Sequence, residues 1–209
     1  MNERNQTGDI VSIVGICGSL RRGSYTRMAV EAALQGAQGI GVQTRLIDLK
    51  DYNLVFCDGK DDESLLPEDV FRLRREVSEA GGIILGTPEY HGSFSGVLKN
   101  ALDLMGFDEI GGKMIGLVGV SGGTFGAVHA LSSLRTVGRS LHAWVIPEQV
   151  SIPVAYKVFD ESGGIKDKNI EKRLKEIGRQ VARFAYLHRS EKAQEFLRAW
   201  ENAPVNPGA

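Results

Sequence analysis

The sequence predicts an α/β fold in which a five-stranded parallel sheet is covered by helices on both faces, a three-layer αβα sandwich. Five short apolar runs alternate with segments whose apolar residues recur every three or four positions, the spacing of an amphipathic helix. This alternation is typical of parallel strands joined by crossover helices. The 209 residues are 42% hydrophobic, which is enough for one substantial core. Neither a repeat nor a linker divides the chain, so we expect residues 1–209 to form one domain.

The five strands are expected at five short, nearly continuous apolar runs. These runs are residues 11–16, 42–47, 82–87, 114–120 and 143–146. Helical spacing of apolar residues follows each of them. The helices are expected around residues 25–36, 66–77, 94–105, 127–141 and 170–188.

Turn and cap residues delimit several of these elements. Gly39 and Gly41 are suited to ending the first helix, and Pro67 to the first turn of the second, after an acidic loop at 57–66. Residues 191–200 either extend the last helix or form a short separate one. Residues 1–9 and 201–209 are polar and are expected to be disordered tails.

Composition narrows the class of protein. The formal net charge is -1 and the pI is near 6.4, which gives no electrostatic reason to expect a nucleic-acid or anionic-membrane partner. Cys17 and Cys57 have neither disulfide-framework nor metal-site spacing, and Cys17 lies in an apolar run that predicts a buried, inert thiol. The first residues lack an apolar signal core, and no apolar run approaches the roughly 20 residues that span a bilayer. We therefore expect a cytoplasmic protein.

Topology indicates where a ligand would bind. Right-handed crossovers restrict the strand order, and 2-1-3-4-5 is the best fit for five strands. In such sheets ligands bind beyond the carboxyl ends of the strands, at the switch between strands 1 and 3. The loops after strands 1, 3 and 4 are therefore the expected binding loops.

The loop after the first strand, residues 18–26, has the chemistry of a phosphate site. Its N–H groups and the dipole of the helix that follows attract an anion, and Arg21 can donate two parallel hydrogen bonds. Ser19, Ser24 and Thr26 add hydroxyl donors. The alternative is an ordinary N-cap by Ser24 beside solvated arginines. The loop lacks GxGxxG, which argues against a Rossmann dehydrogenase.

The loops after the third and fourth strands could approach a flat heterocycle. In residues 86–96, Pro88, Tyr90 and Gly92 could hold backbone amides against a ring; the alternative is a helix-entry loop capped by Ser93 or Ser95. His91 is a weak candidate for proton transfer. In residues 121–126, two adjacent glycines permit left-handed backbone and close approach of a ligand, the alternative being a tight turn.

Taken together, these loops resemble the NADPH-dependent FMN reductase family, which includes quinone, chromate and azo-dye reductases. The resemblance runs from about residue 11 to residue 146 and implies a flavodoxin-like fold, bound FMN, and NADPH or NADH as electron donor. Its motifs are Gly18-Ser19-Leu20-Arg21 followed by Ser24, and Pro88-Glu89-Tyr90 followed by Leu98-Lys99-Asn100-Ala101-Leu102-Asp103.

The resemblance also assigns cofactor-binding residues. In the family the first loop holds the FMN phosphate, the second lies against the isoalloxazine ring and the third reaches its pyrimidine side. The matching residues are Ser19, Arg21, Ser24 and Thr26, then Pro88, Glu89, Tyr90, His91 and Gly92, then Ser121, Gly122 and Gly123. The chain departs from the family at His91, where Asn is usual, and at Phe94 and Ser95, near which Pro is common.

What the resemblance implies is an enzyme in which flavin N5 carries the chemistry and no side chain is catalytic. N–H groups of residues 121–123 would stabilise the reduced flavin. The alternatives are a flavodoxin-type electron carrier, which the near-neutral charge disfavours, and a flavin-binding redox sensor without turnover. Free flavin, quinone, azo dye, metal oxyanion and organoarsenical all stay open as acceptors. A homodimer or homotetramer is implied, packed through the helix after the second loop and its apolar end at 104–107.

Overall fold

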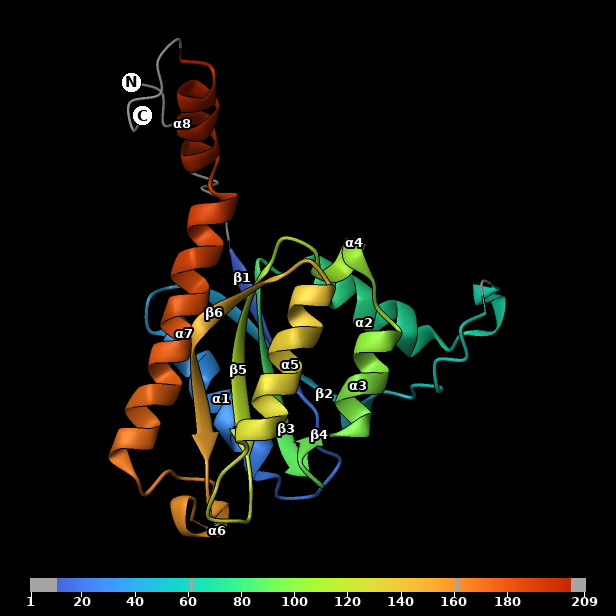
Figure 1. Ribbon diagram of the computed structural model, residues 1–209, viewed down its shortest axis with the longest axis vertical. Helices are drawn as coiled ribbons and strands as arrows, with labels where there is room; N and C mark the ends of the chain where they lie inside the picture. Colours follow the sequence, from blue (N-terminus) through green and yellow to red (C-terminus); the bar gives the residue numbers. More distant parts are fainter. Residues whose placement is uncertain (1–10, 61, 161, 204–209) are drawn as a thin grey trace.

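The computed structural model describes residues 11–60, 62–160 and 162–203, and it has the predicted three layers (Figure 1). Five parallel strands form the central sheet in the order β2-β1-β3-β5-β6, which confirms the predicted order 2-1-3-4-5. A short additional strand, β4, pairs antiparallel with the end of β3. The strands are β1 (Ser12–Cys17), β2 (Gln43–Asp48), β3 (Gly82–Tyr90), β4 (Ser93–Phe94), β5 (Met114–Val120) and β6 (Trp144–Ile152).

Helices cover both faces of the sheet and divide the core in two. Helices α1 and α7 pack on one face, and α2, α3 and α5 on the other. The helices are α1 (Tyr25–Gln38), α2 (Glu68–Ser78), α3 (Gly96–Asp103), α4 (Phe107–Ile110), α5 (Val128–Ser140), α6 (Ala155–Val158), α7 (Lys168–Arg189) and α8 (Glu191–Glu201). Two 3₁₀ turns, η1 (Leu49–Asp51) and η2 (Glu63–Leu65), complete the chain.

Glycines allow α1 and α7 to approach closely. A Cβ atom added to Gly36 would lie 1.9 Å from the carbonyl oxygen of Lys175, and one added to Gly178 would lie 1.8 Å from that of Ala33. Neither neighbour is a movable side-chain end, so no larger residue fits at either position without separating the helices. This contact fixes α1, and therefore its N-terminus, relative to the sheet.

Several boundaries differ from the predicted ones. β3 continues to Tyr90 because its end pairs with β4, and β6 continues to Ile152 although Pro147 and Glu148 break its apolar pattern. β6 is an edge strand with a register shift near Ile115 and Leu117 of β5, and edge strands tolerate such residues. The short helices α4 and α6 were not predicted.

The ends of several helices also differ from the predicted boundaries or decide between predicted alternatives. α2 begins after Pro67, which is its N-cap rather than a first-turn residue, and α3 begins at Gly96 rather than at residue 94. Ser190 separates α7 from α8, so the segment 191–200 is a separate helix, and it continues to Glu201 within the predicted tail. Residues 1–9 and 204–209 lie outside the described part. Across the described ranges, no helix is both long and apolar enough to cross a membrane.

Candidate functional site

The carboxyl ends of β1, β3 and β5 meet at one edge of the sheet, the lower edge in Figure 1. The strand order reverses between β1 and β3, so the three loops expected to bind a ligand converge at the switch point. Two short hydrogen bonds tie the first two loops together. Gly18 N–H donates to Gly86 O at 2.8 Å, and Ser95 Oγ donates to Gly18 O at 2.6 Å.

The first loop forms a cradle of backbone donors. In the described part of the chain, the N–H groups of residues 22, 23, 25 and 26 have no hydrogen-bond acceptor, while residues 22 and 23 form a turn that Ser24 closes. Ser19, Ser24 and Thr26 are buried beside them. Ser24 also caps α1, because its Oγ accepts from Arg27 N–H at 3.3 Å. Open N–H groups at a helix N-terminus, together with hydroxyl groups, fit a phosphate dianion.

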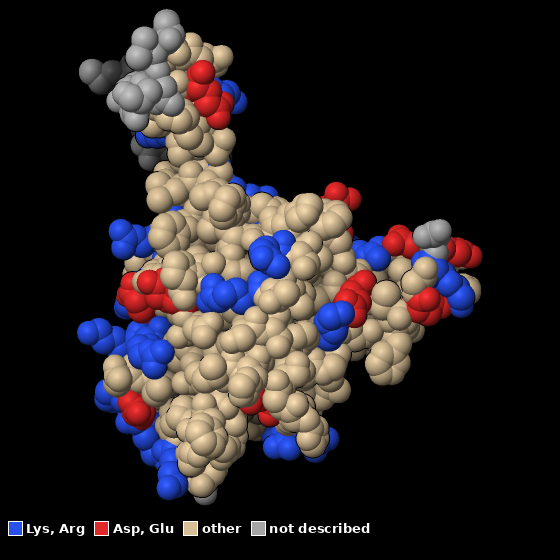
Figure 2. All heavy atoms as spheres, in the orientation of Figure 1, with Lys and Arg blue, Asp and Glu red and all other residues tan. Residues whose placement is uncertain are grey.

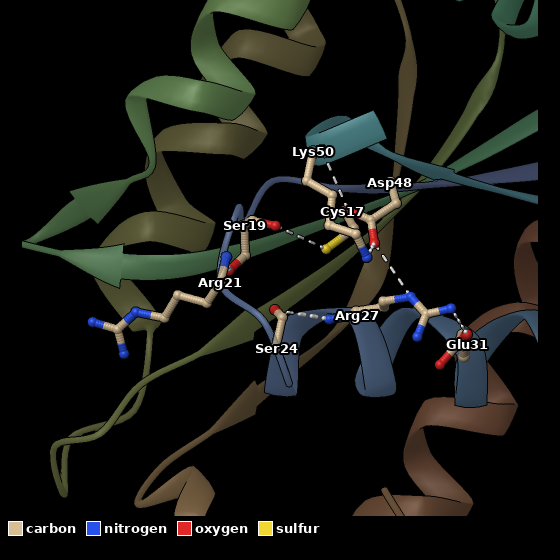
Figure 3. A network of polar contacts seen from close by, with 8 residues as sticks. All are labelled: Cys17, Ser19, Arg21, Ser24, Arg27, Glu31, Asp48 and Lys50. Atoms are coloured by element: carbon tan, nitrogen blue, oxygen red, sulfur yellow. Dashed lines mark hydrogen bonds and ion pairs between the residues drawn. The ribbon is translucent and has the colours of Figure 1, made fainter. Parts of the chain in front are cut away.

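Arg21 does not join the hydroxyl groups of this loop. Figure 3 shows its side chain pointing away from Ser19 and Ser24, and the guanidinium carbon lies 5.8 Å from the centre of the Tyr90 ring. The side chain is exposed, so it can change rotamer at little cost. Arg21 thus spans from the first loop to the second.

An ion-pair network centred on the buried Asp48 lies behind the first loop and was missed from the sequence (Figure 3). Asp48, at the end of β2, accepts a hydrogen bond from Lys50 Nζ at 2.8 Å. It also forms an ion pair with Arg27, whose Nε lies 3.2 Å from the carboxylate. Arg27 also pairs with Glu31 at 2.9 Å. Cys17 faces the same region, and burial raises the pKa of its thiol to about 11, which agrees with the predicted inert thiol. An acidic residue ending the neighbouring strand was the available signal for this network.

The second loop is a β-hairpin whose tip is His91-Gly92. Both tip residues have positive φ, 51° and 77°, as a type I′ turn requires. Glu89 Oε2 accepts from Ala130 N–H at 3.0 Å, so this carboxylate satisfies the start of α5. Pro88 continues the ladder beside Val120 of β5. Tyr90 is 42% exposed, which leaves its ring open at the sheet edge.

Ser95 is the residue that joins the second loop to α3. Its Oγ accepts from Leu98 N–H at 3.2 Å, which confirms it as the helix cap, and its own N–H donates to Thr87 Oγ1 at 3.0 Å. Its bond to Gly18 O was not predicted. Where Pro is common in the family, this chain has Ser95, whose side chain connects the first and second loops by a hydrogen bond.

The third loop presents different donors from those expected. Ser121 N–H donates to Ile152 O at 2.9 Å and Gly123 N–H to Ser121 Oγ at 3.0 Å, so only the Gly122 N–H of the expected trio is open. Neither Gly122 nor Gly123 has positive φ; the left-handed glycine is Gly126, at 73°. A Cβ there would lie 2.3 Å from Ser151 Oγ. Phe125 of this loop is 92% exposed and was not predicted.

Comparisons with known proteins agree with this architecture. A family model described as NADPH-dependent FMN reductase matches residues 11–157. The NADPH-dependent FMN reductase ArsH of Shigella flexneri is 33% identical over 184 residues, which cover 86% of this chain and 70% of that protein. The NAD(P)H-dependent FMN reductase PA1204 of Pseudomonas aeruginosa is 36% identical over 165 residues, covering 76% and 86%. Among solved structures, the flavoenzyme FerB of Paracoccus denitrificans superimposes with a TM-score of 0.69 at 22% identity, covering 86% of this chain and 99% of that one.

Proposed function

We propose, for a chain that belongs to the NADPH-dependent FMN reductase family, that FMN binds with its phosphate in the first loop and its ring between the second and third. The protein is an FMN-dependent oxidoreductase that takes electrons from NAD(P)H and reduces small acceptors. The proposal concerns which residues hold the cofactor and which acceptor is used.

The observation that carries the proposal is the set of open N–H groups at residues 22, 23, 25 and 26, beside three buried hydroxyl groups. A terminal phosphate dianion fits this cradle better than the internal pyrophosphate of FAD, so FMN is the preferred flavin. Bound FMN supplies the redox chemistry, since it accepts hydride from a nicotinamide and passes electrons on. The chain itself supplies binding, orientation and polarity.

Each loop has a separate task in this proposal. Ser19, Ser24 and Thr26 hold the phosphate, with Arg21 turning in from the Tyr90 side. Pro88 and Tyr90 lie against the ring, while Glu89, His91 and Gly92 keep the hairpin in shape. Gly122 N–H faces the pyrimidine side, and Ser121 and Gly123 hold that loop in place.

The remaining partners follow from the same site. We propose NADPH as the preferred donor and a quinone or free flavin as acceptor, with donor and acceptor using one pocket in turn. A reductase that draws on NADPH has to meet that nucleotide, which supports a cytoplasmic location. A homodimer or homotetramer is proposed, without nucleic-acid or membrane partners.

The test combines cofactor titration with rapid kinetics. Fluorescence titration of purified protein should show FMN binding more tightly than FAD. In anaerobic stopped-flow, NADPH should bleach the bound flavin rapidly, and a quinone should then restore its colour. Bleaching by dithionite but not by NADPH would indicate an electron carrier, and failure to take up FMN would refute the proposed site.

A further inference from the structure

Val154, between β6 and α6, has an unusual backbone conformation. Its φ and ψ are 45° and 49°, in the left-handed region. Of the described residues other than glycine, His91 and His142 are the other two with positive φ. A β-branched side chain is poorly suited to this region, so surrounding contacts must hold Val154 there. Such strain often lies at functional sites.

The contacts that hold Val154 belong to the third loop. Val154 N–H donates to Gly123 O at 3.1 Å, and Ala155 N–H donates to Ser121 O at 3.0 Å. Ser121 N–H returns a bond to Ile152 O at 2.9 Å. Three bonds therefore attach the loop after β5 to the last residue of β6 and the segment that follows it.

These bonds determine where the open N–H groups of the loop point. In a trans peptide the carbonyl and the following N–H point in opposite directions, and the described chain contains no cis peptide. With the carbonyls of Ser121 and Gly123 turned toward residues 152–155, the N–H groups of Gly122 and Thr124 point away from that segment. Neither N–H has an acceptor in the described part of the chain.

The order of strands in the sheet shows which loop these N–H groups face. β5 lies between β6 and β3, so the side away from the end of β6 is the side of β3 and its hairpin. That is where the second loop carries Tyr90. Gly122 and Thr124 therefore present two backbone donors toward the crevice between the second and third loops.

We infer that Val154 is a positioning residue that aims the Gly122 and Thr124 N–H groups at the pyrimidine carbonyl edge of the flavin. The inference rests on the proposed FMN site and adds a residue that touches no cofactor. Donors at this edge stabilise the negative charge that the ring gains on reduction. The left-handed backbone of Val154 would thus set how much more tightly reduced FMN is held than oxidised FMN.

Two substitutions separate the backbone effect from the side chain. Val154→Pro removes the N–H and fixes φ near −65°, so it should release the loop. The ratio of reduced to oxidised FMN affinity, measured as the midpoint potential, should fall about tenfold, the scale of one charge-assisted hydrogen bond. Val154→Asn tolerates the left-handed region, so it should keep the wild-type potential and raise the melting temperature.

The outcomes are distinct. A wild-type potential in Val154→Pro, or an equal shift in Val154→Asn, would overturn the inference. If Val154→Pro does not fold, the midpoint potential of Val154→Asn still decides, because a shifted value would show that the side chain of Val154, and not its left-handed backbone, sets the relative affinity for reduced FMN. Wild-type protein is titrated with FMN first. Failure of that titration counts against the proposed function, whereas normal binding with unresponsive Val154 variants counts against this inference alone.

Discussion

At the scale of single residues, His91 forms the tip of the β3–β4 hairpin together with Gly92. Both have positive φ, and Asn-Gly is the preferred pair for such a turn. We predict that His91→Asn keeps turnover and stabilises the protein slightly, because Asn visits the left-handed region more readily. His91→Val should cost about 1–2 kcal/mol of unfolding free energy. Urea denaturation measures both.

The same variants test the rival role of His91. A histidine that transfers a proton would be lost in His91→Asn, and turnover would fall while FMN affinity and stability stayed normal. That result would contradict a purely conformational role. The exposed position of His91 at a turn explains why an imidazole replaces the usual Asn without disturbing the hairpin.

Arg21 and Arg22 form a matched pair for testing the phosphate site. Both are exposed and adjacent, but only Arg21 lies over Tyr90 at the crevice. Arg21→Ala should weaken FMN binding by about 1.5–3 kcal/mol, the scale of a hydrogen bond to a charged group. Arg22→Ala is the control and should bind FMN normally. A loss confined to Arg22→Ala would reverse the assignment.

At the scale of elements, Lys113 connects β5 to the end of α2. Its buried Nζ donates to the carbonyl oxygens of Val77 and Ser78, the latter at 2.7 Å. Burial, and next the charge of Arg189, lower the pKa of Lys113 from 10.5 to about 8. Between these two values the unfolded chain binds the proton more strongly than the folded chain, so stability rises with pH.

We predict that this rise disappears when Lys113 is replaced by Met. Wild-type stability relative to Lys113→Met should increase between pH 8 and pH 10.5, by at most about 3 kcal/mol. Comparing the two proteins at each pH removes contributions from other titrating groups. Urea denaturation at pH 7.5, 9 and 10.5 makes the measurement. A difference that stays constant with pH would show that Lys113 titrates normally.

The elements also show what the sequence could predict. Helix spacing and apolar runs place the five parallel strands and five main helices, because each pattern is local. The length of β6 could not be predicted, since Pro147 and Glu148 are acceptable there only because β6 is an edge strand. The open donors of the third loop depend on bonds from Ser121, Val154 and Ala155 between segments distant in sequence, which no local pattern encodes.

At the scale of the whole molecule, an arm of residues 53–60 and 62–66 stands off the body beside α3 (Figure 1). Asn100 of α3 holds it, since its Nδ2 donates to Val55 O at 2.8 Å and its Oδ1 accepts from Cys57 N–H at 3.0 Å. Charges of both signs lie along the arm (Figure 2). Phe56 and Leu65 are nonetheless 86% and 84% exposed.

The arm offers a contact surface for the proposed oligomer that differs from the one expected from the sequence. The apolar end at 104–107 was expected to face a partner, but Leu104 and Met105 are buried. Phe107 alone of the large apolar side chains at this end is exposed, at 58%, and it stacks on His142. The arm adds Phe56 and Leu65, two apolar side chains that are more exposed than Phe107. Both side chains lie on the arm held by α3, the helix through which the oligomer is proposed to pack, so contact with a second subunit would cover them.

We therefore predict a homodimer or homotetramer that depends on the arm. Light scattering should give two or four times the 22.7 kDa chain mass for the wild-type protein. The double variant Phe56→Ser/Leu65→Ser should lower that mass, because it removes apolar area that would otherwise be buried between subunits. Phe196→Ser is the matched control, since Phe196 is 68% exposed but lies on α8, away from the arm. A monomeric wild type would contradict the oligomer, and dissociation of Phe196→Ser alone would move the contact surface to α8.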